Sequence, residues 1–151
     1  MPNQIALREA QDLLFFAYRD FTNAGDRVLA ELGLGRAHHR ALHFIGRAPG
    51  MSVTELLGIL RITKQSLARV LGDLLARGYV AQAPGQGDRR QRLLRLTAEG
   101  IALEQQLFAA QCACLAPAYE NAGPAAVDGF RRVMRAIMEP AARDYIDGAK
   151  R

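Results

Sequence analysis

Polar side chains that can read DNA bases stand at the start of one helical stretch. They are Lys64, Gln65, Ser66 and Arg69. The apolar residues of this stretch recur at three- and four-residue steps, so we expect them on the opposite, inward face. They are Leu67, Val70, Leu71 and Leu74. Arginine pairs with guanine edges, glutamine with adenine and serine with either, while a helix N-terminus favours phosphate. The outer face therefore predicts DNA contact; an ordinary solvated helix face is the alternative.

Arginines crowd a second segment, directly after Asp88. They are Arg89, Arg90, Arg92 and Arg95, beside a loop that contains two glycines. An exposed arginine on a hairpin tip suits a narrow minor groove, where the negative potential of DNA is enhanced. Asp88 precedes Arg90 by two residues and is placed to brace its guanidinium. A solvated charged loop is the alternative interpretation.

Capping signals predict the helices that carry the first segment. Ser52 and Glu55 form a capping box for a short helix at residues 53–60. After a tight turn, Thr63 can cap a second helix at residues 64–77. This pattern of helix, short turn and helix predicts a helix-turn-helix unit.

A hairpin is expected to follow. Gly78 ends the second helix, and residues 79–82 and 93–96 read as two short strands. The basic, glycine-rich tip spans residues 83–91. A basic hairpin directly after a helix-turn-helix predicts a winged helix.

Amphipathic helices are expected on both sides of this unit. Their ranges are 4–23 and 37–47 before it, and 98–117 and 125–147 after it. Gly25 and residues 32–35 should break the first pattern, and residues 48–50 should stop the second. Thr97 caps the third, and Pro140 should kink or interrupt the last. The predicted fold class is mainly α with a small β-hairpin wing.

The outer helices carry more apolar surface than the small central unit can cover. Packing them against a second copy covers this surface economically, so we expect a homodimer. The alternative is that the helices pack only on each other within one chain.

Charge is divided unevenly along the 151 residues. Residues 36–95 hold eleven basic and three acidic side chains, +8, whereas the rest holds nine and twelve, −3. A positive middle between negative flanks favours a polyanion as partner. No apolar run is long enough to span a membrane, the first residues do not resemble a signal peptide, and two cysteines make no disulfide framework. We expect a soluble, cytoplasmic protein with no membrane contact.

Two short motifs resemble those of the MarR (multiple antibiotic resistance regulator) transcription factors. They are Asp88-Arg89-Arg90, similar to D-x-R, and residues 96–100, Leu-Thr-Ala-Glu-Gly, similar to L-T-x-x-G. The order of helices and wing is also similar over nearly the whole chain. Residues 34–80 resemble the petP-type subgroup of photosynthetic and related proteobacteria.

The resemblance implies a homodimer on pseudo-palindromic operator DNA, with recognition helices in successive major grooves and wings in flanking minor grooves. Matched by position, Arg90 is the minor-groove arginine, Asp88 its brace and Lys64 a phosphate contact, while Gln65, Ser66 and Arg69 lie at base-reading positions. Residues 1–151 then form one MarR-type domain. Its expected parts are dimerisation helices at about 4–35 and 118–148, the winged helix at about 36–97 and a connecting helix at about 98–117.

Such proteins often bind a small aromatic or phenolic acid between the dimer helices and the winged helix. The candidate lining residues here are Phe15, Phe16, Tyr18, Arg19, His38, His39 and His43. Aromatic residues at helical spacing also serve as ordinary core. His39 and His43 share a helix face, yet no neighbouring cysteine or acid completes a metal site, so we expect no metal. The clustered imidazoles are an alternative source of pH sensitivity, and Cys112 and Cys114 an alternative site of thiol sensing.

Enzyme classes are disfavoured. The sequence has no phosphate-binding glycine loop after a strand, no G-x-S-x-G turn and no H-E-x-x-H motif, and we expect no cofactor. The expected function is a sequence-specific transcription regulator, a repressor released by a small ligand. A non-specific architectural DNA binder and a winged helix that binds protein instead of DNA remain as alternatives.

Overall fold

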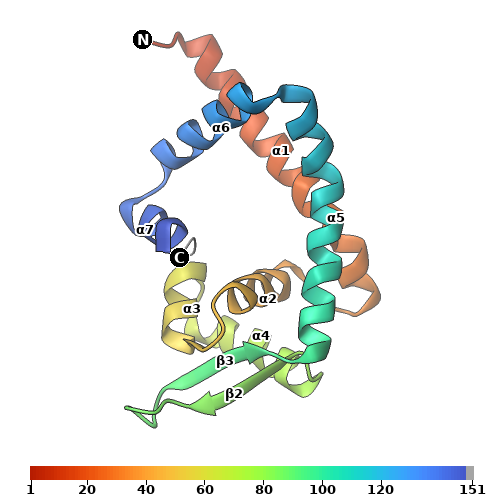
Figure 1. Ribbon diagram of the computed structural model, residues 1–151, viewed down its shortest axis with the longest axis vertical. Coiled ribbons are helices and arrows are strands. Elements are labelled where there is room, and N and C mark those ends of the chain that lie inside the picture. Colours follow the sequence, from red (N-terminus) through yellow and green to blue (C-terminus); the bar gives the residue numbers. More distant parts are fainter. Residues whose placement is uncertain (149–151) are drawn as a thin grey trace.

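The computed structural model describes residues 1–148, which form seven helices and three short strands around one small core. In chain order the elements are α1 (Gln4–Glu31), α2 (Arg36–Arg47), β1 (Met51–Ser52), α3 (Val53–Leu60), α4 (Lys64–Ala76), β2 (Val80–Pro84), β3 (Arg92–Leu96), α5 (Ala98–Ala122), α6 (Pro124–Ile137) and α7 (Pro140–Gly148). The long helices α1 and α5 rise from a lower unit that holds α2 to α4 and the strands (Figure 1). The mainly helical, winged fold class is confirmed.

The predicted caps are confirmed. The Glu55 N–H donates to Ser52 Oγ over 3.0 Å and the Ser52 N–H donates to Glu55 Oε2 over 3.4 Å, which is the reciprocal pairing of a capping box. Thr63 Oγ1 accepts from the Ser66 N–H at 3.0 Å. These caps fix where α3 and α4 begin, and therefore the geometry of the turn between them.

The wing has three strands, one more than the sequence predicts. The order is β1-β3-β2, with both pairs antiparallel, and β1 adds Met51 opposite Leu94. A two-residue strand carries no alternation in its sequence, so pattern alone does not reveal it. It forms because Met51 and Ser52 pair with Leu94 and Leu93 of β3 directly before α3 begins.

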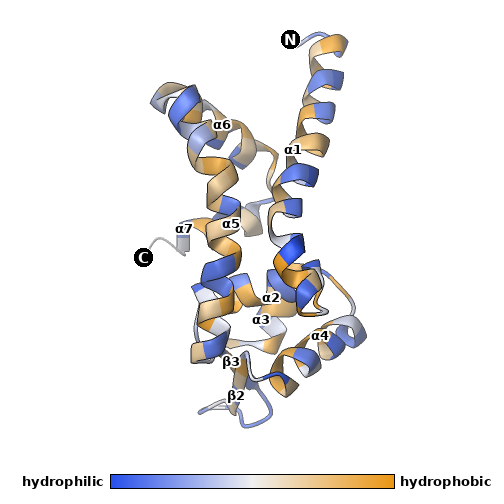
Figure 2. Ribbon diagram, turned by 90° about the vertical axis from the view of Figure 1, so that its right-hand side faces the viewer, coloured by the Kyte–Doolittle hydropathy of each residue, from blue (hydrophilic) through white to orange (hydrophobic). Residues whose placement is uncertain are grey.

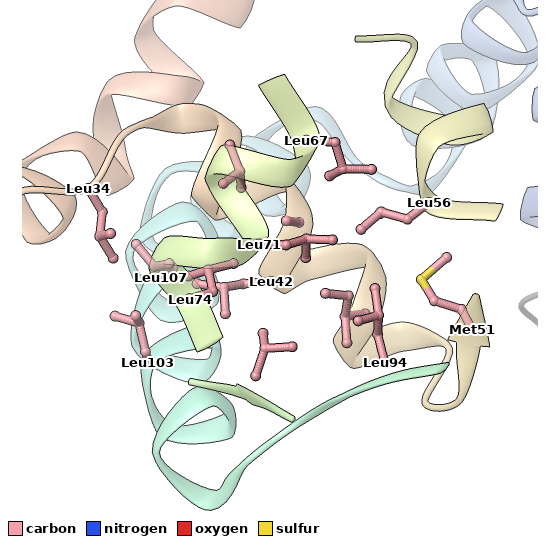
Figure 3. Close-up of a cluster of buried hydrophobic side chains, with 14 of the residues drawn as sticks. Leu34, Leu42, Met51, Leu56, Leu67, Leu71, Leu74, Leu94, Leu103 and Leu107 are labelled. Atoms are coloured by element: carbon pink, nitrogen blue, oxygen red, sulfur yellow. The ribbon is translucent and has the colours of Figure 1, made fainter. Parts of the chain in front are cut away.

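The core lies within the lower unit and draws on every element around it (Figure 3). Leucines dominate it, and those with almost no exposed surface are Leu29, Leu42, Leu56, Leu67, Leu74, Leu94 and Leu107. Among residues 1–148, α6 and α7 contribute no buried side chain. The winged helix is therefore packed together with the lower turns of α1 and α5, while the C-terminal helices α6 and α7 lie outside this core.

Two expected helix ends are wrong. Helix α1 continues through Gly25 to Glu31, because Gly25 is a point of close packing and not a break: a Cβ there would lie 3.2 Å from His39 Cε1. Helix α5 continues past Pro117 to Ala122, where its last turn packs Tyr119 against Phe130 of α6, with ring centroids 6.3 Å apart. The interruption expected at Pro140 is confirmed, since α6 ends at Ile137 and α7 begins at Pro140.

One junction joins the wing to α5. The Tyr79 carbonyl accepts from the Thr97 N–H at 3.0 Å, and Thr97 Oγ1 donates to the Gly78 carbonyl at 2.5 Å. Gly100 lies so close to the Tyr79 backbone that a Cβ on Gly100 would be 1.9 Å from the Tyr79 carbonyl oxygen. The threonine and glycine of the L-T-x-x-G motif are thus required by packing.

Gly100→Ala should destabilise the fold by about 3 kcal/mol, because backbone must move to admit the methyl group. Gly58→Ala in α3 is the matched control, since a Cβ at Gly58 meets nothing within 4 Å. The control should be stabilised by up to about 1 kcal/mol through helix propensity. Urea denaturation measures both; equal stability of the two variants would contradict the close approach.

Candidate nucleic-acid interface

The outer face of α4 is polar and accessible. Lys64, Gln65 and Arg69 are exposed, while the four predicted inward residues of this helix are buried. Ser66 is half-buried, and its Oγ accepts a hydrogen bond from the Thr63 hydroxyl at 2.9 Å. Ser66 therefore supports the cap of α4 and also lies at its exposed edge.

The acidic residue of α4 is held by α2. His38 Nδ1 accepts from the Gly35 N–H at 3.0 Å, so the ring proton is on Nε2, which donates to Asp73 Oδ2 at 2.8 Å. This contact joins the start of α2 to α4. His38 thus has a structural partner on α4, and it does not line the cavity between α1, α2 and α5.

The tip of the wing is closed by its own backbone. The Gly85 N–H donates to the Gln91 carbonyl at 3.0 Å, and a Cβ on Gly85 would be 2.6 Å from Asp88 O. Asp88 Oδ1 accepts from the Arg90 N–H at 2.9 Å and lies 3.6 Å from Arg90 Nε. The Asp88 carboxylate therefore bonds directly to the backbone of the wing tip, and it lies farther from the Arg90 guanidinium.

The wing arginines point into solvent. The Arg90 side chain is 94% exposed, and Arg89, Arg92 and Arg95 are exposed as well. Helix α4 and the wing lie at the same end of the molecule, opposite the N-terminus (Figures 1 and 2). One end of the chain thus presents an exposed polar helix beside a cationic hairpin, an arrangement that suits the grooves and phosphates of DNA.

A cavity of about 300 Å³ lies between α1, α2 and α5. It is lined by Tyr18, Phe21, Thr22, Arg36, His39, Arg40, His43, Phe44 and Gln111. Three of the candidate pocket residues, Tyr18, His39 and His43, are among them. The structure therefore brings together part of the predicted set.

The other four candidates lie elsewhere. Phe15 and Phe16 are exposed on α1 and contact each other edge to face, with centroids 5.2 Å apart. Arg19 lies over the Phe16 ring and pairs with Asp20, and His38 pairs with Asp73. These residues belong to the upper part of α1 or to the α2–α4 contact.

Sequence reasoning missed the arginines of the cavity. Arg36 and Arg40 precede and follow His39 on α2, and with His43 they have the three- and four-residue spacing of one helix face. Arg36 pairs with Asp26 at 2.9 Å, while Arg40 donates to Tyr18 Oη at 2.7 Å. The spacing of these residues along α2 is the sequence signal that could have identified the two arginines as cavity residues. The cavity is consequently cationic and partly aromatic.

Other candidate chemistry finds less support. No group of three or more histidines, cysteines or acids among residues 1–148 is arranged to hold a metal ion. Cys112 is half-buried and Cys114 is exposed on α5. Over the same residues, no helix combines the length and apolar character needed to cross a membrane.

Burial lowers the pKa of both His39 and His43. Asp26 opposes this in part at His39, where Arg40 adds a smaller lowering effect, and at His43 the nearby Arg47 and His39 lower the pKa further. Because the unfolded chain then binds more protons, stability is full above the ordinary histidine pKa and falls as the pH drops through it. We expect the free energy of unfolding to fall by up to about 1 kcal/mol between about pH 7.5 and 6, allowing for solvent screening. Urea denaturation of a His39→Gln/His43→Gln variant should show a flatter profile, whereas Arg132→Ala should keep the wild-type slope. A wild-type profile that is flat over this range would contradict the pKa directions.

Comparison with known proteins agrees with this arrangement. A model of the MarR family matches residues 32–91. The HTH-type transcriptional regulator PetP of Rhodobacter capsulatus is 50% identical over 139 residues, which cover 92% of this chain and 84% of PetP. The transcriptional activatory protein BadR of Rhodopseudomonas palustris is 32% identical over 102 residues, 63% of this chain and 58% of BadR.

Solved structures share the fold. A crystal structure of MarR superposes with a TM-score of 0.70 at 23% identity, covering 97% of this chain and 98% of that one. A mutant MarR from E. coli complexed with operator DNA has a TM-score of 0.70 at 19% identity, covering 92% of this chain and all of that one. With half of its residues shared with PetP over nearly its full length, the chain belongs to the MarR family of DNA-binding transcription regulators.

Proposed function

We propose that two copies of this chain form a homodimer that binds a pseudo-palindromic operator and represses transcription until a small ligand releases it. The observation that carries the DNA contact is the exposed polar face of α4 beside the arginine-rich wing at one end of the molecule. In this proposal Gln65, Ser66 and Arg69 read base edges, and Lys64 contacts phosphate. Arg89, Arg90 and Arg92 contact the minor groove and its phosphates, with Asp88 ordering the tip.

Uncovered apolar side chains support the homodimer. They lie on α1, α5 and α6, and include Ile5, Leu13, Phe15, Phe16, Phe108, Leu115, Tyr119, Phe130, Val133 and Ile137. Orange, apolar stretches run along α1 and α5 away from the core (Figure 2). Many exposed apolar side chains on amphipathic helices favour a protein interface there. The parts about 4–35 and 118–148 would then dimerise, 36–97 would bind DNA and 98–117 would connect them.

The cationic cavity supports ligand release. Its arginines and tyrosine suit a small organic anion with an aromatic body, since arginine binds carboxylates and aromatic rings stack edge to face. The cavity touches α2, and His38 of α2 contacts Asp73 of α4. A ligand that shifts α2 would therefore act on the recognition helix through a direct contact.

Fluorescence anisotropy with DNA from upstream of the chain's own gene tests the proposal, with a scrambled duplex as control and titrations at about 50 and 200 mM salt. Preference for the upstream DNA at both salt concentrations supports a sequence-specific regulator. Equal binding that collapses with salt would instead indicate an architectural DNA binder. Absence of binding at both would favour a protein-binding module. The name of BadR describes an activator, so a reporter assay with and without the protein decides the direction of regulation.

Arg90→Ala should weaken binding to the preferred DNA by about 1–3 kcal/mol, because an exposed groove-contacting arginine is lost while the fold does not use it. Arg132→Ala is the matched control, since it removes the same charge from α6, where Arg132 is 79% exposed. Anisotropy measures both affinities, and circular dichroism checks the fold. Unchanged affinity of Arg90→Ala would show that the minor-groove assignment is wrong.

A further inference from the structure

Arg61 adopts a backbone conformation that a side chain disfavours. It ends α3 with φ 52° and ψ 38°, in the left-handed region. Among residues 1–148 it is the one non-glycine residue with positive φ; the others are Gly33, Gly50, Gly78 and Gly123. Glycine would adopt this conformation without the steric cost of a Cβ. Such an outlier points from an observed strain toward a role for the side chain.

The Arg61 side chain contacts the C-terminal helix. Its Nη2 donates to Glu139 Oε2 at 2.5 Å, and Glu139 directly precedes Pro140, the first residue of α7. Hydrogen bonding to Arg61 lowers the pKa of the Glu139 carboxyl, so the pair is charged at neutral pH. Both side chains are about two-thirds exposed, at 66% and 64%. The contact is therefore accessible to solvent and modest in strength.

Helix α7 reaches the winged helix at two separate points. Besides the Arg61–Glu139 pair, Tyr145 contacts Phe44 of α2 edge to face, with centroids 5.6 Å apart. Between α3 and α7 lies an open cavity of about 800 Å³, and α7 has no buried residue. Arg135 of α6 also pairs with Asp147 of α7 at 3.0 Å, so α7 is held to α6 as well, and the two contacts above are what join it to the winged helix.

The Arg61–Glu139 pair lies close to the start of α4. Arg61 stands two residues before Thr63, the cap of α4, and α7 continues from α6, which packs against α5. Figure 1 shows the resulting closed path from α5 through α6 and α7 back to α3. The lower unit is joined to the long helices by the lower ends of α1 and α5 on one side, and α7 adds an attachment on the opposite side.

We propose that Glu139 is a positioning residue for DNA binding: by holding Arg61, it fixes the α3–α4 turn, and thus the start of α4, relative to the long helices. A unit attached on one side can pivot, whereas a unit attached on two sides keeps one orientation. In a dimer, that orientation sets whether both recognition helices fit successive major grooves at once. The proposal rests on the DNA contact and homodimer proposed above.

The first test needs no DNA. Hydrogen exchange is measured in the wild type, in Glu139→Gln and in Asp128→Asn, a control that removes the same charge from an exposed pair on α6. In Glu139→Gln, exchange should quicken about 2- to 5-fold over residues 61–66 and α7, the range expected for an exposed ion pair. Asp128→Asn should leave these segments unchanged, and the swap of Arg61→Glu with Glu139→Arg should restore protection. Unchanged exchange in Glu139→Gln would overturn the proposal.

The second test compares a duplex with both operator halves and a duplex with one half. Glu139→Gln should weaken binding to the full operator about 3- to 10-fold, because two subunits lose their orientation, and leave binding to the half operator unchanged. The salt dependence should stay the same, since no phosphate contact is lost, and the charge swap should restore affinity.

Three results would overturn the positioning role. Faster exchange with unchanged operator affinity would mean that the contact holds α7 without affecting α4. Tighter binding by Glu139→Gln, with a salt slope lowered by about 1 in Arg61→Gly, would mean that Arg61 itself contacts phosphate and Glu139 competes for it. An equal loss of affinity for the full and half operators would mean that each α4 binds its own half-site less well, whatever the orientation of the two subunits. A wild type with no preference for upstream DNA is a failure of the proposed function, and it is visible before any variant is compared.

Discussion

Apolar side chains on α1, α5 and α6 face outward because no other element within residues 1–148 covers them. The fully buried leucines all lie between Leu29 and Leu107, so the winged helix closes its core with the lower turns of α1 and α5, and the outer turns of these helices do not share in it. Phe130, Val133 and Ile137 remain exposed on a helix whose opposite side carries arginines. Amphipathic helices in this state need a partner surface. Covering them with a second copy would set two winged helices at a fixed distance.

Within the lower unit, short-range polar contacts decide where α4 and the wing lie. Thr97 and Gly100 bring α5 against the Tyr79 carbonyl, and this junction fixes the root of the wing. His38 and Asp73 fix α2 against α4. Each contact joins an element of the proposed ligand cavity or of the proposed dimer interface to α4 or the wing, the elements proposed to contact DNA. A change in the upper part of the molecule can therefore reach the recognition helix without a long chain of intermediates.

Much of this fold could be predicted from local chemistry. Ser52, Thr63 and Thr97 indicate three helix starts, because a capping side chain and the backbone N–H that it accepts from lie within four residues of sequence. The inward leucines of α4 followed from period alone. The predictions were wrong where residues distant in sequence determine the structure. Gly25 resembles a helix break in the sequence, but in the fold His39 packs closely against it. Strand β1 forms by pairing with β3, which follows it by some forty residues.

The candidate sites show the same division. The residues of α4 and the wing could be named from the sequence, since exposure follows from helical period and hairpin position, whereas their DNA contacts stay a prediction. The cavity was found only in part: Tyr18, His39 and His43 line it, but Arg36 and Arg40 were overlooked and Phe15, Phe16 and Arg19 lie elsewhere. Which side of a long helix meets a neighbour depends on tertiary packing, and the relevant neighbours, α2 and α5, are far apart in sequence.

Sedimentation equilibrium of the purified chain at micromolar concentration decides whether two copies assemble into the proposed homodimer. We expect a mass twice the 16.5 kDa of a single chain, and we expect Phe130→Glu/Val133→Glu to shift this mass toward the monomer while the winged helix stays folded. A wild-type protein that sediments at 16.5 kDa with its helices intact would contradict it, because the apolar faces of α1, α5 and α6 would then be stable in water without a partner.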